Sequence, residues 1–246
     1  MHMKKCLAFL VICSLMLSLF LYGVADETRP EVYTSGDWEY IVLEDGTAEI
    51  TGYCNDETET VVIPEEIDAK KVVGIGDRAF IYLETIHSIT IPDNVTSIGI
   101  NPFQFCSGLM NIIVSPDHSV FATINGVLFD KKEKKLICYP CAFKDDHYEV
   151  PQGIQVIGAD AFCSCDSLAR ITIPDSVTSI GDEAFFHCAS LTRIMIPDSV
   201  TSIGEIAFDG CDSLTVTVGH DSYAARYCKD NGLKYQYPDS NDWLNN

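Results

Sequence analysis

The feature that most constrains this chain is an internal repeat with a period of 23 residues. Residues 173–195 read IPDSVTSIGDEAFFHCASLTRIM and residues 196–218 read IPDSVTSIGEIAFDGCDSLTVTV, so their first nine residues are identical. The pattern recurs at residues 63–90, 91–113, 114–149 and 150–172, and the first and third of these units carry five and thirteen additional residues. Repeats of about 20 to 29 residues are typical of chains in which each repeat forms one coil of a stacked solenoid.

One repeat consists of a short strand followed by a turn. In residues 191–196 (LTRIMI) apolar side chains occupy the first, fourth and sixth places, and the last three residues alternate as in a strand with one buried face. Pro197 has no N–H group with which to continue regular pairing, and Asp198-Ser199 is typical of a turn. A single coil cannot bury its own apolar side chains, so the coils must stack.

Two residue types recur at one position in most coils and predict columns through the stack. We expect a glycine column that permits tight bends and an aromatic column that fills the core, with no cofactor role for either. The glycine column comprises Gly76, Gly99, Gly158, Gly181 and Gly204, and the aromatic column comprises Phe80, Phe103, Phe162, Phe185 and Phe208.

The segment before the repeats, residues 26–60, predicts an N-terminal cap. Asp45-Gly46 lies between two alternating runs, Trp38–Leu43 and Thr47–Thr51, which is a strong signal for a β-hairpin. A solenoid needs such a cover because its terminal coil would otherwise expose an apolar end.

The segment after the repeats, residues 219–246, predicts a C-terminal cap and a polar tail. Ser222 is a suitable N-cap for a short helix that ends at Asp230, and Asn231-Gly232 can stop that helix. Residues 233–237 (LKYQY) then read as a closing strand.

The irregular unit, residues 114–149, predicts a second hairpin. Two apolar runs, residues 126–129 and 136–140, flank the charged segment Asp130–Lys135. We expect this hairpin to project from the stack, with its four lysines either solvated or available as a docking site.

The repeated motif IPDSVTSIGDEAFFHCASL resembles the BspA-like, or treponemal-type, leucine-rich repeats, and the resemblance covers residues 61–218. It implies a β-rich leucine-rich repeat solenoid of short strands, turns and short helical segments, with a helix-strand C-terminal cap. The hairpin N-terminal cap predicted above completes this architecture. Members of this family are mostly secreted or surface proteins of microbes, and some are adhesins that bind extracellular-matrix proteins or other cells.

The first 25 residues predict a secretory signal peptide. Lys4-Lys5 precedes an apolar run from Leu7 to Tyr22, and Gly23-Val24-Ala25 supplies small residues for cleavage. A retained membrane anchor is the alternative, although the run is shorter than the roughly 20 apolar residues of a spanning helix. We expect no membrane span in the mature chain, and a location that is extracellular or loosely associated with the cell surface.

The cysteines and histidines predict structure more than chemistry. Cys106, Cys165, Cys188 and Cys211 each follow a column phenylalanine by three residues, which favours parallel buried thiols, with disulfides as the alternative in an exported chain. A CxxC at Cys138 and Cys141 has no matching second pair for zinc. The sequence contains no nucleophile elbow, phosphate-binding glycine loop or HExxH motif. We therefore predict no catalytic residues, no metal site, no cofactor and no enzyme activity.

The remaining candidate for function is the outward face of the repeat strands. Its predicted members are Ser88, Thr90, Asn111, Ile113, Arg170, Thr172, Arg193 and Met195. This set contains no acidic residue, although the chain has 36 acidic and 16 basic residues and a net charge of −20. Exposed Arg, Met and Ile on an open strand face favour protein binding, and the ordinary β-propensity of Thr and Ile is the alternative explanation.

Three classes of function remain to be weighed. The acidic composition argues against nucleic acid and anionic lipid as partners, because both require clusters of Lys and Arg. A non-catalytic adhesion or interaction module that binds an extracellular protein or glycan is favoured. A structural solenoid of the cell envelope that self-associates is the alternative, and an enzyme is disfavoured.

Overall fold

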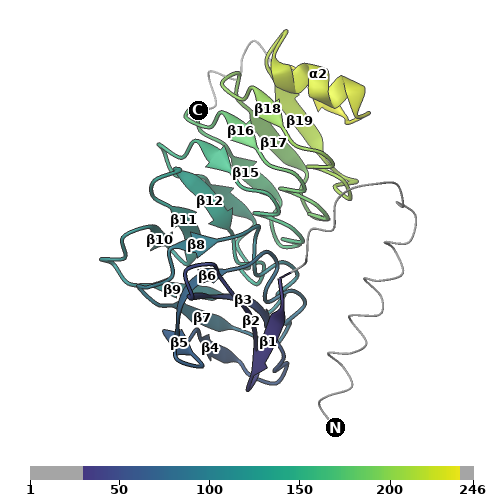
Figure 1. Cartoon of the computed structure of the whole chain (residues 1–246). Coiled ribbons are helices and arrows are strands. Elements are labelled where there is room, and N and C mark those ends of the chain that lie inside the picture. Colours follow the sequence, from purple (N-terminus) through teal and green to yellow (C-terminus); the bar gives the residue numbers. More distant parts are fainter. Residues whose placement is uncertain (1–29, 239–246) are drawn as a thin grey trace, which may run out of the picture.

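A computed structural model describes residues 30–238 and shows coils stacked in one direction from the N-terminal to the C-terminal end (Figure 1). The solenoid predicted from the repeat is therefore confirmed. The predicted signal peptide and the polar tail that follows Pro238 lie outside the described residues.

One side of the stack carries the longer strand of each 23-residue coil, and we call it the long-strand face. Neighbouring strands pair in parallel and in register, so that Arg170 lies opposite Arg193 and Ile171 opposite Ile194. The face consists of two sheets. The first contains β4 (Thr60–Val62), β7 (Ser88–Ile91) and β9 (Asn111–Val114), and the second contains β13 (His147–Glu149), β15 (Arg170–Thr172), β17 (Arg193–Ile196), β19 (Thr215–Val218) and β20 (Tyr235–Gln236).

The other two sheets combine strands of two residues with strands of four to six residues. The order of the N-terminal sheet is β1-β2-β3-β6-β5, with β8 also paired to β6, and the order of the next sheet is β10-β11-β12-β14-β16-β18. The N-terminal sheet contains β1 (Val32–Ser35), β2 (Trp38–Val42), β3 (Ala48–Tyr53), β5 (Glu66–Ile67), β6 (Lys70–Ile75) and β8 (Ser97–Ile98). The next sheet contains β10 (Phe121–Ile124), β11 (Val127–Asp130), β12 (Lys135–Cys138), β14 (Val156–Ile157), β16 (Ser179–Ile180) and β18 (Ser202–Ile203).

The chain beyond the last coil forms the helix α2 (Tyr223–Asp230), which contacts β18 and β19 at the C-terminal end of the stack (Figure 1). The Ser222 Oγ caps this helix by accepting a hydrogen bond from the Ala225 N–H at 3.0 Å. At the opposite end β2 and β3 pair as an antiparallel hairpin, and β3 pairs in parallel with β6.

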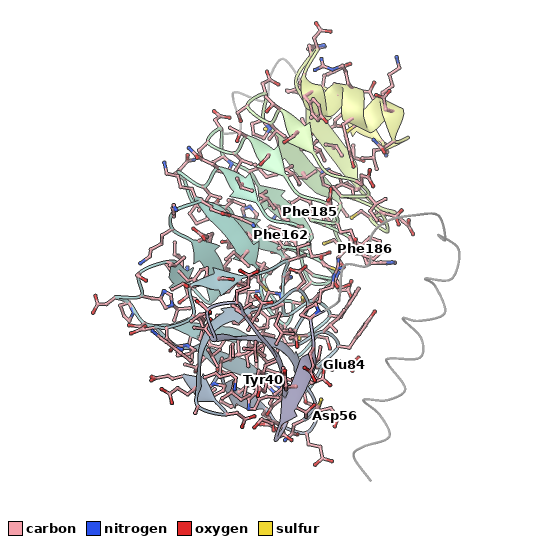
Figure 2. The ribbon with its side chains drawn as sticks, viewed as in Figure 1. Tyr40, Asp56, Glu84, Phe162, Phe185 and Phe186 are labelled. Atoms are coloured by element: carbon pink, nitrogen blue, oxygen red, sulfur yellow. The ribbon has the colours of Figure 1, made fainter. Side chains whose placement is uncertain are left out.

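The aromatic column packs as predicted through the C-terminal coils. Phe162 and Phe185 lie in neighbouring coils (Figure 2), and their ring centroids are 5.1 Å apart with an interplanar angle of 13°. The ring centroids of Phe185 and Phe208 are 5.1 Å apart with an interplanar angle of 4°. In the irregular unit the column position is taken by Tyr139, whose ring stacks on Phe162 at 5.2 Å. Tyr139 was not predicted as a member of the column, because the column was defined by phenylalanine alone.

The glycine column serves contact between coils, and the predicted role in tight bends is wrong. The positive φ angles of the described residues include none of its five members. A Cβ on Gly181 would lie 2.5 Å from the Ala159 nitrogen, and a Cβ on Gly204 would lie 2.3 Å from the Asp182 nitrogen. The left-handed conformation falls two residues later, as at Ile206 with φ of 45°. At Gly99, Gly158, Gly181 and Gly204 glycine is needed because a side chain would collide with the backbone of the preceding coil.

Main-chain hydrogen bonds connect the segments that follow these glycines, and we call this set the turn ladder. Alternate N–H groups of one coil donate to alternate carbonyl oxygens of the next. The N–H groups of Glu183, Phe185 and His187 donate to the carbonyls of Glu205, Ala207 and Asp209 at 3.1, 2.8 and 2.8 Å.

The hairpin of the irregular unit does not project from the stack, which corrects that prediction. The buried apolar residues of the stack form two separate cores, one toward each end. Both faces of β11 and β12 are buried, because Leu128 and Ile137 pack in the N-terminal core whereas Phe129 and Leu136 pack in the C-terminal core. β12 also pairs in parallel with β14 and so belongs to the stack. The hairpin is thus a wall between two cores, as its near-continuous apolar runs indicate in retrospect.

The irregular coil is two residues shorter than the next coil in its turn segment, and this interrupts the turn ladder. Leu136 lies opposite Ile157. The Tyr139 N–H donates to the Ala161 carbonyl at 2.8 Å, and the equivalent Phe162 N–H one coil later donates to the Ala184 carbonyl at 2.8 Å. Three steps from Leu136 to Tyr139 therefore match five steps from Ile157 to Phe162.

Polar side chains bridge the resulting gap, and we call Arg78, Asn101, Gln104 and Asp160 the polar seam. One Asp160 carboxylate oxygen accepts a hydrogen bond from Arg78 Nη2 at 2.8 Å, and the other accepts one from Gln104 Nε2 at 2.8 Å. The Asn101 amide donates to the Asp160 carbonyl at 2.8 Å. Burial raises the pKa of Asp160 above its ordinary value, although the Arg78 guanidinium acts in the opposite direction.

The predicted cysteine column lies in the core, and each thiol has a regular acceptor one coil earlier. The thiols of Cys106, Cys188 and Cys211 donate to main-chain carbonyls of the aromatic column at 2.9 to 3.0 Å. Burial raises the pKa of Cys106 to about 12. A protonated thiol that donates to a carbonyl is a poor nucleophile, so this column has the character of core packing.

Candidate binding surface

The structure places the eight predicted surface residues in two separate groups on the long-strand face. Ser88 and Thr90 on β7 lie opposite Asn111 and Ile113 on β9. Arg170 and Thr172 on β15 lie opposite Arg193 and Met195 on β17. Within each group the side chains form two rows, because alternate residues of a strand point to the same side.

The irregular unit separates the two groups. β9 and β13 belong to different sheets, so the surface is not one continuous stripe. The space beside β9 is occupied by the segment around Gly126 and Phe143: a Cβ on Gly126 would lie 2.9 Å from the Phe143 ring and 3.7 Å from the Asn111 side-chain oxygen. Sequence reasoning could not find this interruption, because the additional residues of the unit hide where the next repeat strand begins.

The C-terminal group extends further than the sequence analysis proposed. β13 places His147 opposite Arg170 and Glu149 opposite Thr172, and the His147 Nε2 lies 3.1 Å from the Thr172 hydroxyl. The rows continue on β19 as Thr215 and Thr217, and the N-terminal group begins with Thr60 and Val62 on β4. The sequence contains a signal for the strand β13: His147-Tyr148-Glu149-Val150 precedes Pro151 in the same way as Arg170–Ile173 precedes Pro174.

The expectation of a surface without acids is wrong at one strand. Glu149 is exposed and stands in the row of Thr172 and Met195. The other positions of the C-terminal group hold His147, two arginines, three threonines and Met195, and Met195 is 49% exposed.

Arg170 and Arg193 define the electrostatics of this group. Both are exposed, they lie directly opposite one another on paired strands, and neither forms an ion pair with any residue between 30 and 238. Like charges at directly opposite positions destabilise a sheet. In a chain with a net charge of −20, this unpaired positive pair is available to an anionic group of a ligand.

The part of the chain that the structure describes contains no group of three or more His, Cys, Asp or Glu side chains placed to hold a metal ion. Between residues 30 and 238, no helix combines the length and the apolar character needed to cross a membrane.

Comparison with known proteins identifies the family. The profile of the BspA type Leucine rich repeat region matches residues 29–143 and 137–221, with six copies. The chain belongs to the BspA-type leucine-rich repeat family. Comparison with curated protein sequences gives no significant match.

A solved structure of a bacterial leucine-rich repeat protein shares the fold of this BspA-type protein. A leucine-rich repeat protein from Eubacterium ventriosum has a TM-score of 0.57 at 20% identity and covers 78% of this chain and 73% of its own. The T. pallidum leucine-rich repeat protein has a TM-score of 0.45 at 24% identity, with coverage of 84% and 98%. A leucine-rich cell surface protein from Faecalibacterium prausnitzii has a TM-score of 0.37 at 19% identity, with coverage of 85% and 98%.

Proposed function

We propose that this BspA-type protein is an exported, non-catalytic module whose long-strand face binds an extracellular protein or glycan. In this proposal residues 1–25 direct export, residues 26–60 and 219–246 cap the stack, and residues 61–218 form the recognition array. Leucine-rich repeat proteins are interaction modules, and family membership supports this class of function.

The observation that carries the proposal is the unpaired arginine pair of β15 and β17. Arg170 and Arg193 lie opposite one another on neighbouring strands, and neither has a carboxylate partner between residues 30 and 238. Met195 beside them adds an exposed apolar contact. A cationic pair next to an apolar side chain on a rigid sheet suits a ligand with an acidic group beside an apolar one.

The test replaces both arginines with glutamate. We expect Arg170→Glu with Arg193→Glu to abolish capture of extracellular-matrix, mucus or cell-envelope components by the mature protein. A matched control is Lys132→Glu with Lys134→Glu, which makes the same change in charge at exposed positions of the turn between β11 and β12. Capture that persists in the arginine variant, with an unchanged melting temperature, would reject this surface.

A second candidate is a structural role in which copies associate with one another. It is favoured by β4, which ends its sheet and contains Val62, a residue that is 63% exposed. An unpaired edge strand is a template for association. Light scattering over a concentration series separates the two candidates. Ordered growth of the pure protein supports association, and a constant mass supports the recognition module.

A further inference from the structure

The turn ladder ends without a partner at the last coil. Each N–H of Glu183, Phe185 and His187 donates to the next coil, and the equivalent positions one repeat later are Ile206, Phe208 and Gly210. For the N–H groups of these three residues, the described chain from residue 30 to residue 238 supplies no acceptor. The coil keeps the conformation that aims them outward, because Ile206 and Gly210 have φ of 45° and 75°, as Glu183 and His187 have 54° and 56°.

These three donors line a groove of about 610 Å³ at the C-terminal end of the solenoid. The last coil forms one wall with Asp209, Asp212 and Ser213. The end of α2 and the segment after it form the other wall with Tyr227, Asn231 and Lys234. The helix α2 packs on β18 and β19, so it does not fill the groove beside the turn segment of the last coil.

The earlier coils show what fits such a row of donors. Where the following coil has the same length in its turn segment, the row is met by alternate main-chain carbonyls of that segment, as the carbonyls of Glu205, Ala207 and Asp209 show. Carbonyls at every second residue are a property of a polypeptide backbone, so the occupant is a peptide segment. The exposed Asp209 and Asp212 line the groove beside the row, and Lys234 is the one cation among its lining residues. Because negative charges outnumber positive ones there, the groove favours a basic peptide over an acidic one.

A second copy of this chain is a poor occupant. Its first coil would have to present the matching carbonyls, but Trp38 and Tyr53 cover that end. Their rings lie 6.2 and 5.9 Å from the ring of Phe80, the first phenylalanine of the aromatic column.

We propose that the groove at the C-terminal end of the solenoid docks a basic peptide segment of another protein through main-chain hydrogen bonds to Ile206, Phe208 and Gly210. This site is independent of the long-strand face and of the arginine pair, so either proposal can fail without the other. An unpaired set of main-chain donors is the usual basis for recognition of an added segment at the edge of a ladder.

The probe is a synthetic peptide with the sequence of residues 203–212, in which Glu205, Asp209 and Asp212 are replaced by lysine and Cys211 by serine. This stretch includes the segment whose carbonyls serve the preceding coil. In the free protein we expect the amides of Ile206, Phe208 and Gly210 to exchange with solvent at least tenfold faster than those of Glu183, Phe185 and His187. Addition of the peptide to the mature protein should slow their exchange at least tenfold, as followed by NMR.

A matched pair of variants tests the location. Ser213→Trp places an indole at the exposed wall of the groove and should weaken peptide binding at least tenfold. Ser190→Trp makes the same change at the equivalent exposed position one coil earlier and should leave binding unchanged. Equal melting temperatures for the two variants show that folding is not the cause.

Three results would overturn the proposal. One is exchange at the three amides that does not respond to millimolar peptide. Another is binding that Ser213→Trp does not weaken. The third is slow exchange already present in the free protein: if removal of residues 239–246 restores fast exchange, the occupant is the chain's own tail, and if dilution restores it, the occupant is a second copy.

Discussion

Removal of the Asp160 carboxylate should destabilise the protein more than removal of a surface charge. The Asp160 side chain is 1% exposed and accepts hydrogen bonds of 2.8 Å from Arg78 and from Gln104. Asp160→Ala leaves the buried Gln104 amide without its carboxylate acceptor, at a cost of about 1 to 3 kcal/mol. Loss of the charge-assisted bond adds about 1 kcal/mol, because Arg78 is 39% exposed and can turn toward water. We expect a total loss of about 2 to 4 kcal/mol in the free energy of unfolding.

Arg78→Met is the complementary change, and its effect should depend on pH. It leaves the Asp160 carboxylate buried without its cation, so the pKa of Asp160 rises further than burial already raises it. A folded-state pKa above the unfolded value means that the native state binds the proton more tightly. The stability of Arg78→Met relative to the parent should therefore fall as pH rises from about 4 to 7, and the two proteins should converge in acid.

Urea unfolding at pH 4 and pH 7 measures both effects. Arg193→Met is the matched control, because this arginine is exposed and forms no ion pair within the described chain, and it should cost less than about 0.5 kcal/mol. A cost below 0.5 kcal/mol for Asp160→Ala, or an effect of Arg78→Met that does not vary with pH, would refute the account of the polar seam.

Further predictions concern the coil backbone and the thiols. Gly181→Ala should lower the free energy of unfolding by about 1 to 3 kcal/mol, because its Cβ would lie 2.5 Å from the Ala159 nitrogen; thermal melting checks this, and an unchanged transition contradicts the contact. Ile206→Gly should stabilise the protein by about 1 kcal/mol, because a β-branched residue is strained at φ of 45°; a lower melting temperature would speak against strain there. Thiol reagents should label the exposed Cys54 in the native protein and should reach Cys106 only after unfolding. Burial raises the pKa of Cys106 to about 12 and keeps its thiol away from solvent. Rapid labelling of Cys106 in the native protein would contradict its burial.

Most of the fold follows from the repeat, because each coil places its apolar residues at the same positions. The strands of the regular units, the aromatic column and the buried cysteine column were all readable from spacing. The purpose of the glycines was not, because contact between the Gly181 position and the coil before it exists only once the coils are stacked.

The candidate surface was predictable as a set of outward positions but not as a shape. Alternation along a strand identifies Arg170 and Arg193 as exposed, and equal spacing in consecutive units places them opposite one another. The break between β9 and β13 depends on where the additional residues of the irregular unit go, and periodicity contains no information about that.

The sequence alone determined the structure of one coil, because the alternation of buried and exposed positions is a local property that recurs in each repeat. What only the tertiary structure decided are the places where the period fails. The hairpin became a wall between two cores, Arg78 reached Asp160 across 82 residues, and the last row of main-chain donors was left without a following coil. The physical reason is that hydrogen bonds and packing between coils depend on register across the whole stack, and a unit with a different length shifts that register for everything beside it.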